Sequence, residues 1–223
     1  MHTPTNPPTS VATPDIRGYE LGPYSTNSYV IPSPDDKSCW IVDPSFDCEP
    51  LLDDVRARGL RPAGIVLTHA HCDHIAGIPD VLRAFPGLPI LVHEAERDWL
   101  GEPELNLSAF SGMPVSVPGP TGTFRDGDML DLGGMPWRVI HTPGHSPGGV
   151  ALYHEPSGTA LVGDALFAGS IGRTDFPGAD HDTLLHSIRT RLYTLPDSTV
   201  ILPGHGPKST IAREKRSNPF VRA

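Results

Sequence analysis

Short apolar runs separated by glycine, proline and aspartate dominate the first half of the chain. Their length and their β-branched residues are typical of strands, which we expect at residues 19–21, 28–31, 39–42, 65–68 and 89–92. Between these runs, apolar residues recur at helical spacing. This pattern predicts helices over residues 46–58, 79–85 and 94–100.

The second half repeats the same kind of pattern after a polar stretch rich in glycine and proline, residues 101–122, which we expect to be a surface loop. Further strands are predicted at residues 129–132, 137–141, 149–153, 160–162 and 200–202, and helices at 181–195 and 209–217. Each half therefore contributes one group of strands and helices. That order fits an α/β fold with two sheets packed face to face and helices outside.

Composition narrows the class of protein. The first fourteen residues hold four prolines and four threonines, so we expect a disordered tail over residues 1–14 and one domain over residues 15–223. A formal net charge of -9 argues against a nucleic-acid partner, and no apolar run has the length of a membrane span. Three cysteines, Cys39, Cys48 and Cys72, cannot form a disulfide framework, which favours the reducing cytoplasm. The oligomeric state is left open.

The stretch THAHCDH, from Thr68 to His74, gathers metal-binding side chains at the end of a predicted strand. In extended chain His69 and His71 point the same way, and a following helical turn would bring His71 and His74 together. Asp73 adds a carboxylate. Imidazole and carboxylate together suit zinc, iron or manganese. The alternative, surface histidines that never meet, does not account for four such residues in six positions.

Three later loops offer further ligands, each at or just after the end of a predicted strand. His145 lies in HTPGHSPGG, Asp164 in LVGDALF and His205 in ILPGHGP. Loops at strand ends can reach one common site. Seven ligands exceed the needs of one tetrahedral ion. The sequence therefore predicts two ions, with one carboxylate that bridges them.

The motif HAHCDH resembles the H-x-H-x-D-H motif of the metallo-β-lactamase-fold hydrolases, and the resemblance runs from about residue 19 to the C-terminus. It implies an αββα sandwich of two mixed sheets with the metal ions at one edge. It also implies that His69, His71 and His145 hold one ion, and that Asp73, His74 and His205 hold the other. Asp164 would bridge the two divalent ions, for which zinc is the first expectation and iron or manganese the alternatives.

Finer motifs resemble the short, single-domain type II glyoxalase-like proteins: GHSPGG, GDALFAGSIGRTDFPG, PGHGP and EKRSNPF. That group implies hydrolysis of thioesters such as S-D-lactoylglutathione. Asp164 stands where many β-lactamases of the superfamily carry a cysteine, which disfavours antibiotic hydrolysis. Asp73 likewise disfavours the oxygen-reducing diiron branch.

The chain also departs from full-length glyoxalase II. No helical C-terminal domain follows the metal-binding motifs, and Gly206-Pro207 follows His205, whereas the full-length enzymes have a tyrosine two residues after that histidine. Arg173 stands where they place a lysine that contacts glutathione. Arg173 could pair with a carboxylate of the substrate. The alternative is a structural ion pair with Asp175.

The implied chemistry is attack of a metal-bound hydroxide on the thioester carbonyl, since two ions that share a water lower its pKa toward about 7. Asp73 would bind metal and orient this nucleophile. Asp43, at the end of a predicted strand, is a candidate partner of a ligand histidine, or else a turn-forming residue before Pro44. The main rival function is a persulfide dioxygenase with a single iron, acting on glutathione persulfide. A non-catalytic metal-binding protein is the third class.

The other candidate ligands are weaker. Cys72 lies between ligands but out of phase with His71, and His141 begins the loop of His145 and could support it. The remaining histidines are expected on the surface or in packing: His2, His93, His154, His181 and His186.

Overall fold

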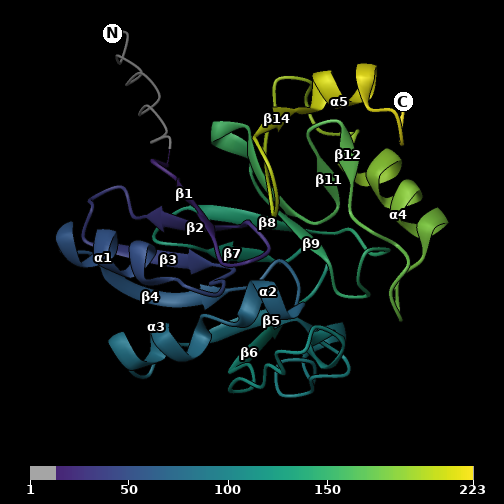
Figure 1. The fold of residues 1–223 in the computed structure, drawn as a ribbon. Helices are drawn as coiled ribbons and strands as arrows, with labels where there is room; N and C mark the ends of the chain where they lie inside the picture. Colours follow the sequence, from purple (N-terminus) through teal and green to yellow (C-terminus); the bar gives the residue numbers. More distant parts are fainter. Residues whose placement is uncertain (1–13, 223) are drawn as a thin grey trace, which may run out of the picture.

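The computed structural model describes residues 14–222, which form two six-stranded sheets with helices on their outer faces (Figure 1). The sheets pack face to face, so the predicted α/β sandwich is confirmed. The predicted tail, residues 1–14, lies outside the described residues except for Pro14.

The first sheet has the strand order β1-β2-β3-β4-β5-β6. Strands β1 to β3 pair antiparallel, and β3 to β6 pair parallel, so the sheet is mixed. Its strands are β1 (Arg17–Leu21), β2 (Thr26–Pro32), β3 (Ser38–Val42), β4 (Arg61–Val66), β5 (Ile90–His93) and β6 (Gly122–Phe124). The helical segments connected to it are α1 (Glu49–Ala57), α2 (Cys72–Ile75), α3 (Ile78–Ala84), η1 (Glu94–Glu96) and η2 (Ser108–Phe110).

The second sheet has the order β14-β13-β10-β9-β8-β7, in which only β10 and β13 pair parallel. Its strands are β7 (Met129–Asp131), β8 (Pro136–His141), β9 (Val150–His154), β10 (Thr159–Gly163), β13 (Val200–Pro203) and β14 (Ser209–Thr210). A small hairpin precedes the helices of this half and consists of β11 (Leu166–Phe167) and β12 (Ser170–Ile171). The helical segments are η3 (Glu155–Ser157), α4 (His181–Ser187), its π-helical continuation η4 (Ile188–Leu192) and α5 (Ile211–Ser217).

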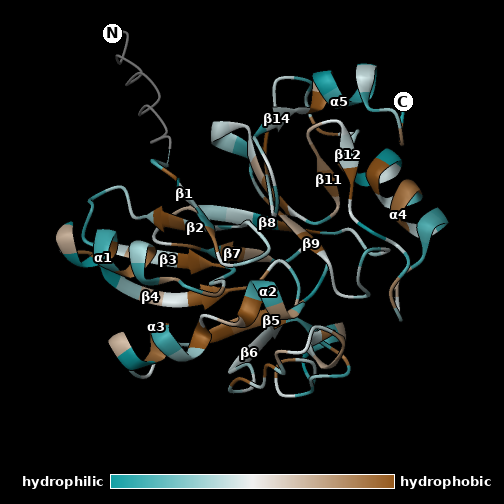
Figure 2. Ribbon diagram, in the orientation of Figure 1, coloured by the Kyte–Doolittle hydropathy of each residue, from teal (hydrophilic) through white to brown (hydrophobic). Residues whose placement is uncertain are grey.

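Successive side chains of the strands point to opposite faces, so the buried apolar residues form three layers. Figure 2 shows hydrophobic residues in brown along strands such as β2 and β3. In β2, Val30 packs under α1 and α3, whereas Tyr29 and Ile31 face the other sheet. In β9, Ala151 packs toward α4 and Leu152 faces the first sheet. Successive side chains of a strand point to opposite faces, so a sheet covered on both sides needs apolar residues at every position.

The boundaries of some helices and strands differ from those predicted from the sequence, because strand pairing overrides the local pattern of apolar residues. The helix predicted over residues 94–100 is reduced to the single turn η1, and the helix predicted from residue 209 begins at Ile211. Ser209 and Thr210 instead form β14, which pairs with β13. Strands of two or three residues, such as β6, β11, β12 and β14, are too short to show a periodicity in the sequence.

Within residues 14–222, no helix has the length and apolar character that crossing a bilayer requires. All three cysteines are buried and have free thiols. Burial raises the pKa of Cys39 to about 12, which keeps this thiol protonated in the core.

Removal of the largest side chain between the sheets should test how much this layer stabilises the fold. Trp137 is fully buried there, so Trp137→Ala should lower the free energy of unfolding by about 3–5 kcal/mol. Denaturant unfolding measures the change. The control is Met129→Ala on the neighbouring strand β7, where the side chain is 59% exposed and we expect a change within about 0.5 kcal/mol. Equal losses in the two variants would contradict this role of the inter-sheet layer.

Candidate metal centre

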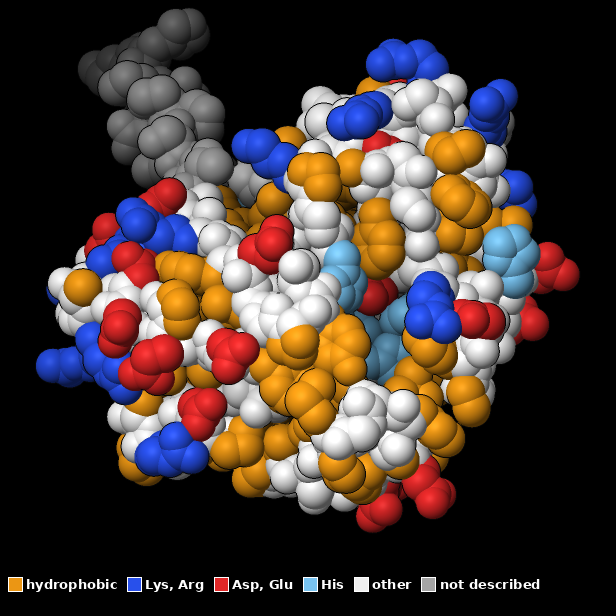
Figure 3. Space-filling model, viewed as in Figure 1, with side chains coloured by type: hydrophobic (Ala, Val, Ile, Leu, Met, Phe, Trp, Pro, Cys, Tyr) orange, Lys and Arg blue, Asp and Glu red, His pale blue; other side chains and the backbone are white. Residues whose placement is uncertain are grey.

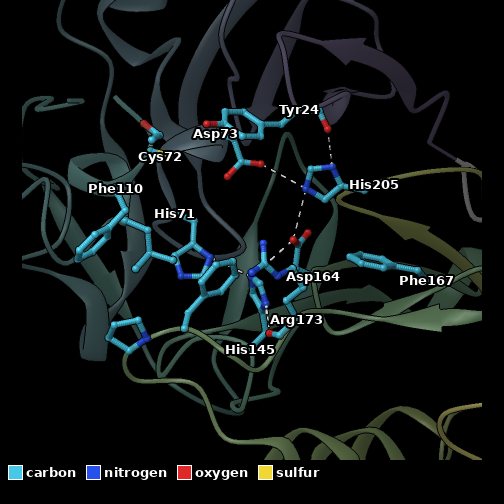
Figure 4. Close-up of a pocket in the computed structure, with 14 residues that line it drawn as sticks. Tyr24, His71, Cys72, Asp73, Phe110, His145, Asp164, Phe167, Arg173 and His205 are labelled. Carbon is cyan, nitrogen blue, oxygen red and sulfur yellow. Dashed lines mark hydrogen bonds and ion pairs between the residues drawn. The ribbon is translucent and has the colours of Figure 1, made fainter. Parts of the chain in front are cut away.

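The seven predicted metal ligands lie on four segments that follow strands β4, β8, β10 and β13. In the first segment the backbone of His71 is extended and α2 begins at the next residue, so the chain changes from strand-like to helical within the motif. The structure brings all seven side chains together at one edge of the two sheets. They are His69, His71, Asp73, His74, His145, Asp164 and His205. Figure 4 shows those that line the cavity beside them: His71, Asp73, His145, Asp164 and His205.

Three imidazoles form the first cluster. His69, His71 and His145 each offer a ring nitrogen, and these atoms lie within 4.8 Å of one another. Nδ1 of His71 is 2.9 Å from Nε2 of His145. Burial lowers the pKa of all three rings, and the nearby His145 lowers that of His71 further, to about 3. The three rings are therefore neutral at neutral pH, which is the state that binds a metal ion.

The second cluster differs from the first because it contains a carboxylate, which carries negative charge. It consists of Asp73, His74 and His205, and Oδ2 of Asp73 lies 3.4 Å from Nε2 of His74 and 3.2 Å from Nε2 of His205. Burial alone would lower the pKa values of both histidines, but the carboxylates of Asp73 and Asp164 outweigh it. They raise the pKa of His74 well above its usual value and that of His205 to about 10. Positive charge is thus favoured where this cluster converges, because two carboxylates face it.

Asp164 contacts both clusters. Its Oδ1 is 3.4 Å from Nε2 of His74, and its Oδ2 is 3.5 Å from Nε2 of His145 and 3.4 Å from Nε2 of His205. Gly204 leaves room for this arrangement, since a Cβ at that position would lie 2.0 Å from Oδ1 of Asp164. Asp164 is thus placed where one carboxylate could contact a cation at either cluster.

Hydrogen bonds to Nδ1 orient four of the five histidines and leave Nε2 directed into the site, while His71 turns its own Nδ1 toward His145. The Nδ1 partners are Thr68 Oγ1 for His69 at 3.1 Å, Asp43 Oδ2 for His74 at 3.0 Å, Arg173 O for His145 at 2.7 Å and Tyr24 O for His205 at 3.1 Å.

Asp43 occupies the position predicted for a partner of a ligand histidine. Besides His74, its carboxylate accepts hydrogen bonds from the backbone N–H of Thr68 at 2.7 Å and the hydroxyl of Thr68 at 2.6 Å. Its backbone adopts the left-handed region, with φ of 50°, which few residues other than glycine adopt. Such strain persists only where surrounding contacts enforce it, and here they hold the carboxylate under the site.

Unpaired buried atoms show that the residues fit metal ions. Among residues 14–222, Nε2 of His69, Nε2 of His74 and Oδ1 of Asp164 are buried without a hydrogen-bond partner. Each such atom costs about 1–3 kcal/mol unless something else satisfies it. Imidazole and carboxylate donors satisfy zinc, iron or manganese. The two clusters with Asp164 between them are thus a candidate dinuclear site.

Some supporting residues carry no signal in the local sequence. The hydroxyl of Thr26 donates to Oδ2 of Asp73 at 2.8 Å, across 47 positions of sequence. Glu96 is fully buried and accepts hydrogen bonds from the backbone of Ala70 and Gly148, in two different ligand loops. Sequence reasoning missed both residues. Only a three-dimensional contact distinguishes Glu96 from the other acids of its segment.

The weaker candidates take other positions. Cys72 belongs to none of the metal-ligand groups found among the described residues, and burial raises the pKa of its thiol to about 11. Nε2 of His141 donates to the carbonyl of Pro147 at 2.9 Å, so His141 supports the His145 loop without contacting a ligand side chain. His93 and His154 are buried away from the clusters, as expected for packing residues.

A cavity of about 460 Å³ opens onto the two clusters. In Figure 3 it is the hollow in which histidine side chains are visible, and hydrophobic side chains gather around it. Arg173, the predicted substrate contact, lines this cavity. Its guanidinium also forms two hydrogen bonds to Asp175, at 2.9 and 2.8 Å. The structure therefore shows the ion pair that was the alternative for Arg173, at the wall of the cavity.

Comparison with known proteins agrees with this geometry. Residues 21–205 match the family model described as the metallo-beta-lactamase superfamily. The hydroxyacylglutathione hydrolase GloC of Haemophilus influenzae is 36% identical over 189 residues, which are 84% of this chain and 89% of that protein. A crystal structure titled BLEG-1 B3 metallo-beta-lactamase is 40% identical with a TM-score of 0.88, over 93% of this chain and 100% of that one. The structure of TTHA1623 in a di-iron-bound form is 36% identical with a TM-score of 0.82, over 92% and 100%.

The resemblance seen in the sequence is thereby confirmed at the level of the family. The family model covers most of the chain, and the solved structures of similar length share its fold. The chain therefore belongs to the metallo-beta-lactamase superfamily and is a metal-dependent hydrolase of that superfamily.

Proposed function

We propose that this chain hydrolyses thioesters, S-D-lactoylglutathione among them. The observation that carries the proposal is the pair of ligand clusters joined by Asp164 at the floor of one cavity. A relative named hydroxyacylglutathione hydrolase, similar over most of both chains, supports the choice of a thioester.

The chain's own residues have definite roles in such a reaction. When bound, two divalent cations would supply Lewis acidity and lower the pKa of a coordinated water toward about 7. His69, His71 and His145 would hold one cation, Asp73, His74 and His205 the other, and Asp164 both. Thr26 fixes the carboxylate of Asp73 through Oδ2, and Asp73 lines the cavity, so its carboxylate can orient the attacking water. A thiolate is a good leaving group, so no strong general acid is required.

The rival persulfide dioxygenase needs a single iron. The second cluster, Asp73, His74 and His205, is as complete as the first, and this favours a dinuclear hydrolase. The metal remains a proposal: zinc suits the donors, and the di-iron form of TTHA1623 makes iron the main alternative.

Hydrolysis of β-lactams is a second candidate, favoured by one observation. The relative with 40% identity is titled a B3 metallo-beta-lactamase, although the sequence motifs favour thioesters. Both substrates present a carbonyl to the same nucleophile, so only a direct comparison of rates separates them. A chromogenic cephalosporin and lactoylglutathione, assayed with the same metal-loaded preparation, provide that comparison.

Metal stoichiometry tests the bridging role of Asp164. The wild-type protein, loaded with zinc and freed of excess metal, should contain two ions per chain by elemental analysis. Asp164→Ala should weaken binding of both ions, because its carboxylate contacts both clusters. Asp182→Ala, which removes an exposed acid at the start of α4, should retain both. One ion in the wild type, held by the three histidines alone, would refute the dinuclear site.

Loss of a cavity-facing ligand should abolish most of the activity. His205→Ala should lower kcat/KM for lactoylglutathione by about 10²-fold or more, the scale of electrostatic stabilisation of a transition state. His186→Ala, at an exposed position of α4, should leave the rate unchanged. Thiol release can be followed with a chromogenic reagent. Wild-type activity in metal-loaded His205→Ala would contradict the proposed site.

A further inference from the structure

The cavity beside the metal centre is apolar over most of its wall. Side chains from four separate segments form that wall: Tyr24, Leu107, Phe110, Phe167, Phe176 and Pro177. Phe110 is 71% exposed and Tyr24 41% exposed, although both are large and apolar. Large apolar side chains kept in contact with water around a concave site are typical of ligand recognition.

The cavity offers little to a charged substrate. Among residues 14–222, Arg173 is the single lysine or arginine in the lining of the cavity, and its guanidinium donates two hydrogen bonds to Asp175. The guanidinium also lies 4.2 Å from the centre of the Phe176 ring, so it is stacked as well as paired. A glutathione thioester carries two carboxylates, which would compete with Asp175 for the guanidinium of Arg173 or lose their hydration against the apolar wall. The net charge of -9 adds a general repulsion of anions.

We infer that the preferred substrates are thioesters whose larger substituent is uncharged and apolar, such as an aromatic or branched hydrocarbon group. This inference rests on the proposed thioester hydrolysis and specifies the substrate class of the same site. The apolar substituent packs against Phe110, Phe167 and Phe176, while the thioester carbonyl faces the two clusters. Burial of apolar surface supplies the binding energy that positions the carbonyl.

The direct test uses two substrates with the same acyl group: the S-benzyl thioester of D-lactate and S-D-lactoylglutathione. The benzyl thioester should have a kcat/KM at least about tenfold higher. The equivalent pair with a benzoyl group, as its methyl thioester and as benzoylglutathione, shows whether the apolar group acts from the acyl side. A higher kcat/KM for the glutathione thioesters would overturn the inference and leave the proposed function intact. No hydrolysis of any thioester by metal-loaded protein would overturn both.

Two variants test whether the apolar wall of the cavity causes the preference for apolar thioesters. Phe110→Ala should lower kcat/KM for the benzyl thioester about tenfold and change that for lactoylglutathione less than about twofold. Phe220→Ala removes another exposed phenylalanine, near the C-terminus, and should change neither. Equal losses for both substrates in Phe110→Ala would show that Phe110 does not select apolar groups.

Removal of the Asp175 carboxylate, which pairs with Arg173, should weaken the preference for apolar over charged thioesters. Asp175→Asn removes the paired carboxylate, so the freed guanidinium should raise kcat/KM for lactoylglutathione several-fold and leave the benzyl thioester unchanged. Asp53→Asn is the matched control, since it breaks an exposed aspartate–arginine pair with Arg56 on α1. No gain for lactoylglutathione in Asp175→Asn would show that the ion pair does not exclude charged substrates.

A separate observation concerns Glu96, a fully buried carboxylate that no ligand cluster uses. Its Oε2 accepts the N–H of Ala70 at 2.6 Å, and its Oε1 accepts the N–H of Gly148 at 2.7 Å. Ala70 lies between His69 and His71, and Gly148 follows His145 by three residues. One side chain therefore joins the two loops that carry the three-histidine cluster.

The space around this contact is closed. A Cβ on Gly148 would lie 2.7 Å from Cγ of Glu96, so the loop can approach the carboxylate only with glycine at this position. Charge-assisted hydrogen bonds to backbone N–H groups are about twice as strong as neutral ones and fix direction as well as distance. We propose that Glu96 is a positioning residue that sets the separation of His145 from His69 and His71, and with it the affinity of this cluster for metal.

Metal affinity tests this role independently of activity. Glu96→Gln keeps the shape but presents an amide N–H₂ to one of the two backbone donors. We expect the affinity for the first Co²⁺ or Zn²⁺ ion to fall about 10- to 100-fold by competition with a chromogenic chelator, with altered visible absorption of the Co²⁺ form. The control is Glu214→Gln, a second fully buried carboxylate, which accepts from Gly169, Ser209 and Asn218 outside the ligand clusters. It should lower the Tm but leave metal affinity within about twofold.

A purely structural role for Glu96 predicts the opposite result. Glu96→Gln would then have a lower Tm, as Glu214→Gln does, but would bind metal as tightly as the wild type. That result would overturn the proposal. Should Glu96→Gln not be recovered folded, Gly148→Ala displaces the same contact from the other loop and should lower metal affinity in the same direction. Unchanged affinity in folded Gly148→Ala would also overturn it.

Discussion

The metal centre depends on how closely the two sheets are held at one edge. Its ligands come from β4 in the first sheet and from β8, β10 and β13 in the second, so a change in sheet separation would move the clusters apart. The apolar layer between the sheets sets this separation, and hydrogen bonds fix it beside the site. The backbone of Val150 donates to Thr68 at 2.9 Å, that of Asn27 to Gly204 at 2.6 Å, and the hydroxyl of Tyr29 to the carbonyl of Pro203 at 2.6 Å. These hydrogen bonds join the two sheets beside the ligand segments, so the packing distance between the sheets also sets the distances between the metal ligands.

The two cation positions are electrostatically unequal. Three neutral imidazoles form one, where burial disfavours any charge on the ligands themselves. The other includes Asp73, whose pKa is held below its usual value by His74 and His205 although burial opposes this. A cation at the first position is held by dipoles and lone pairs, whereas a cation at the second is held largely by opposite charge. Asp164 contacts both clusters, so a cation bound at one cluster would reduce the negative charge that a cation at the other would meet.

Four of the seven candidate ligands, His69 to His74, could be predicted from a local pattern: a period of two, then a helical turn, at the end of an apolar strand. His145, Asp164 and His205 could be predicted only because each lies at or just after the end of another apolar strand. The same reasoning gave the major strands and the two-sheet architecture. It could not give Thr26 or Glu96, whose contacts join segments 47 and 26 or more residues apart. Asp43 was recognisable as an acid at a strand end, but its left-handed backbone follows from contacts with Thr68 and His74. For Arg173 the sequence allowed two partners, and only coordinates show the pair with Asp175 and the stacking on Phe176.

Two residues of the cavity wall hold ligand histidines through their main chains. The carbonyl of Tyr24 orients His205, and the carbonyl of Arg173 orients His145, while the side chains of both residues line the cavity. Every amino acid has that carbonyl, so substitution at either position alters the surface that meets the substrate and keeps the support of the metal ligand. The cavity wall and the support of the ligand histidines therefore use different atoms of the same two residues, so the wall can change in shape and charge while the hydrogen bonds to Nδ1 of His205 and His145 remain.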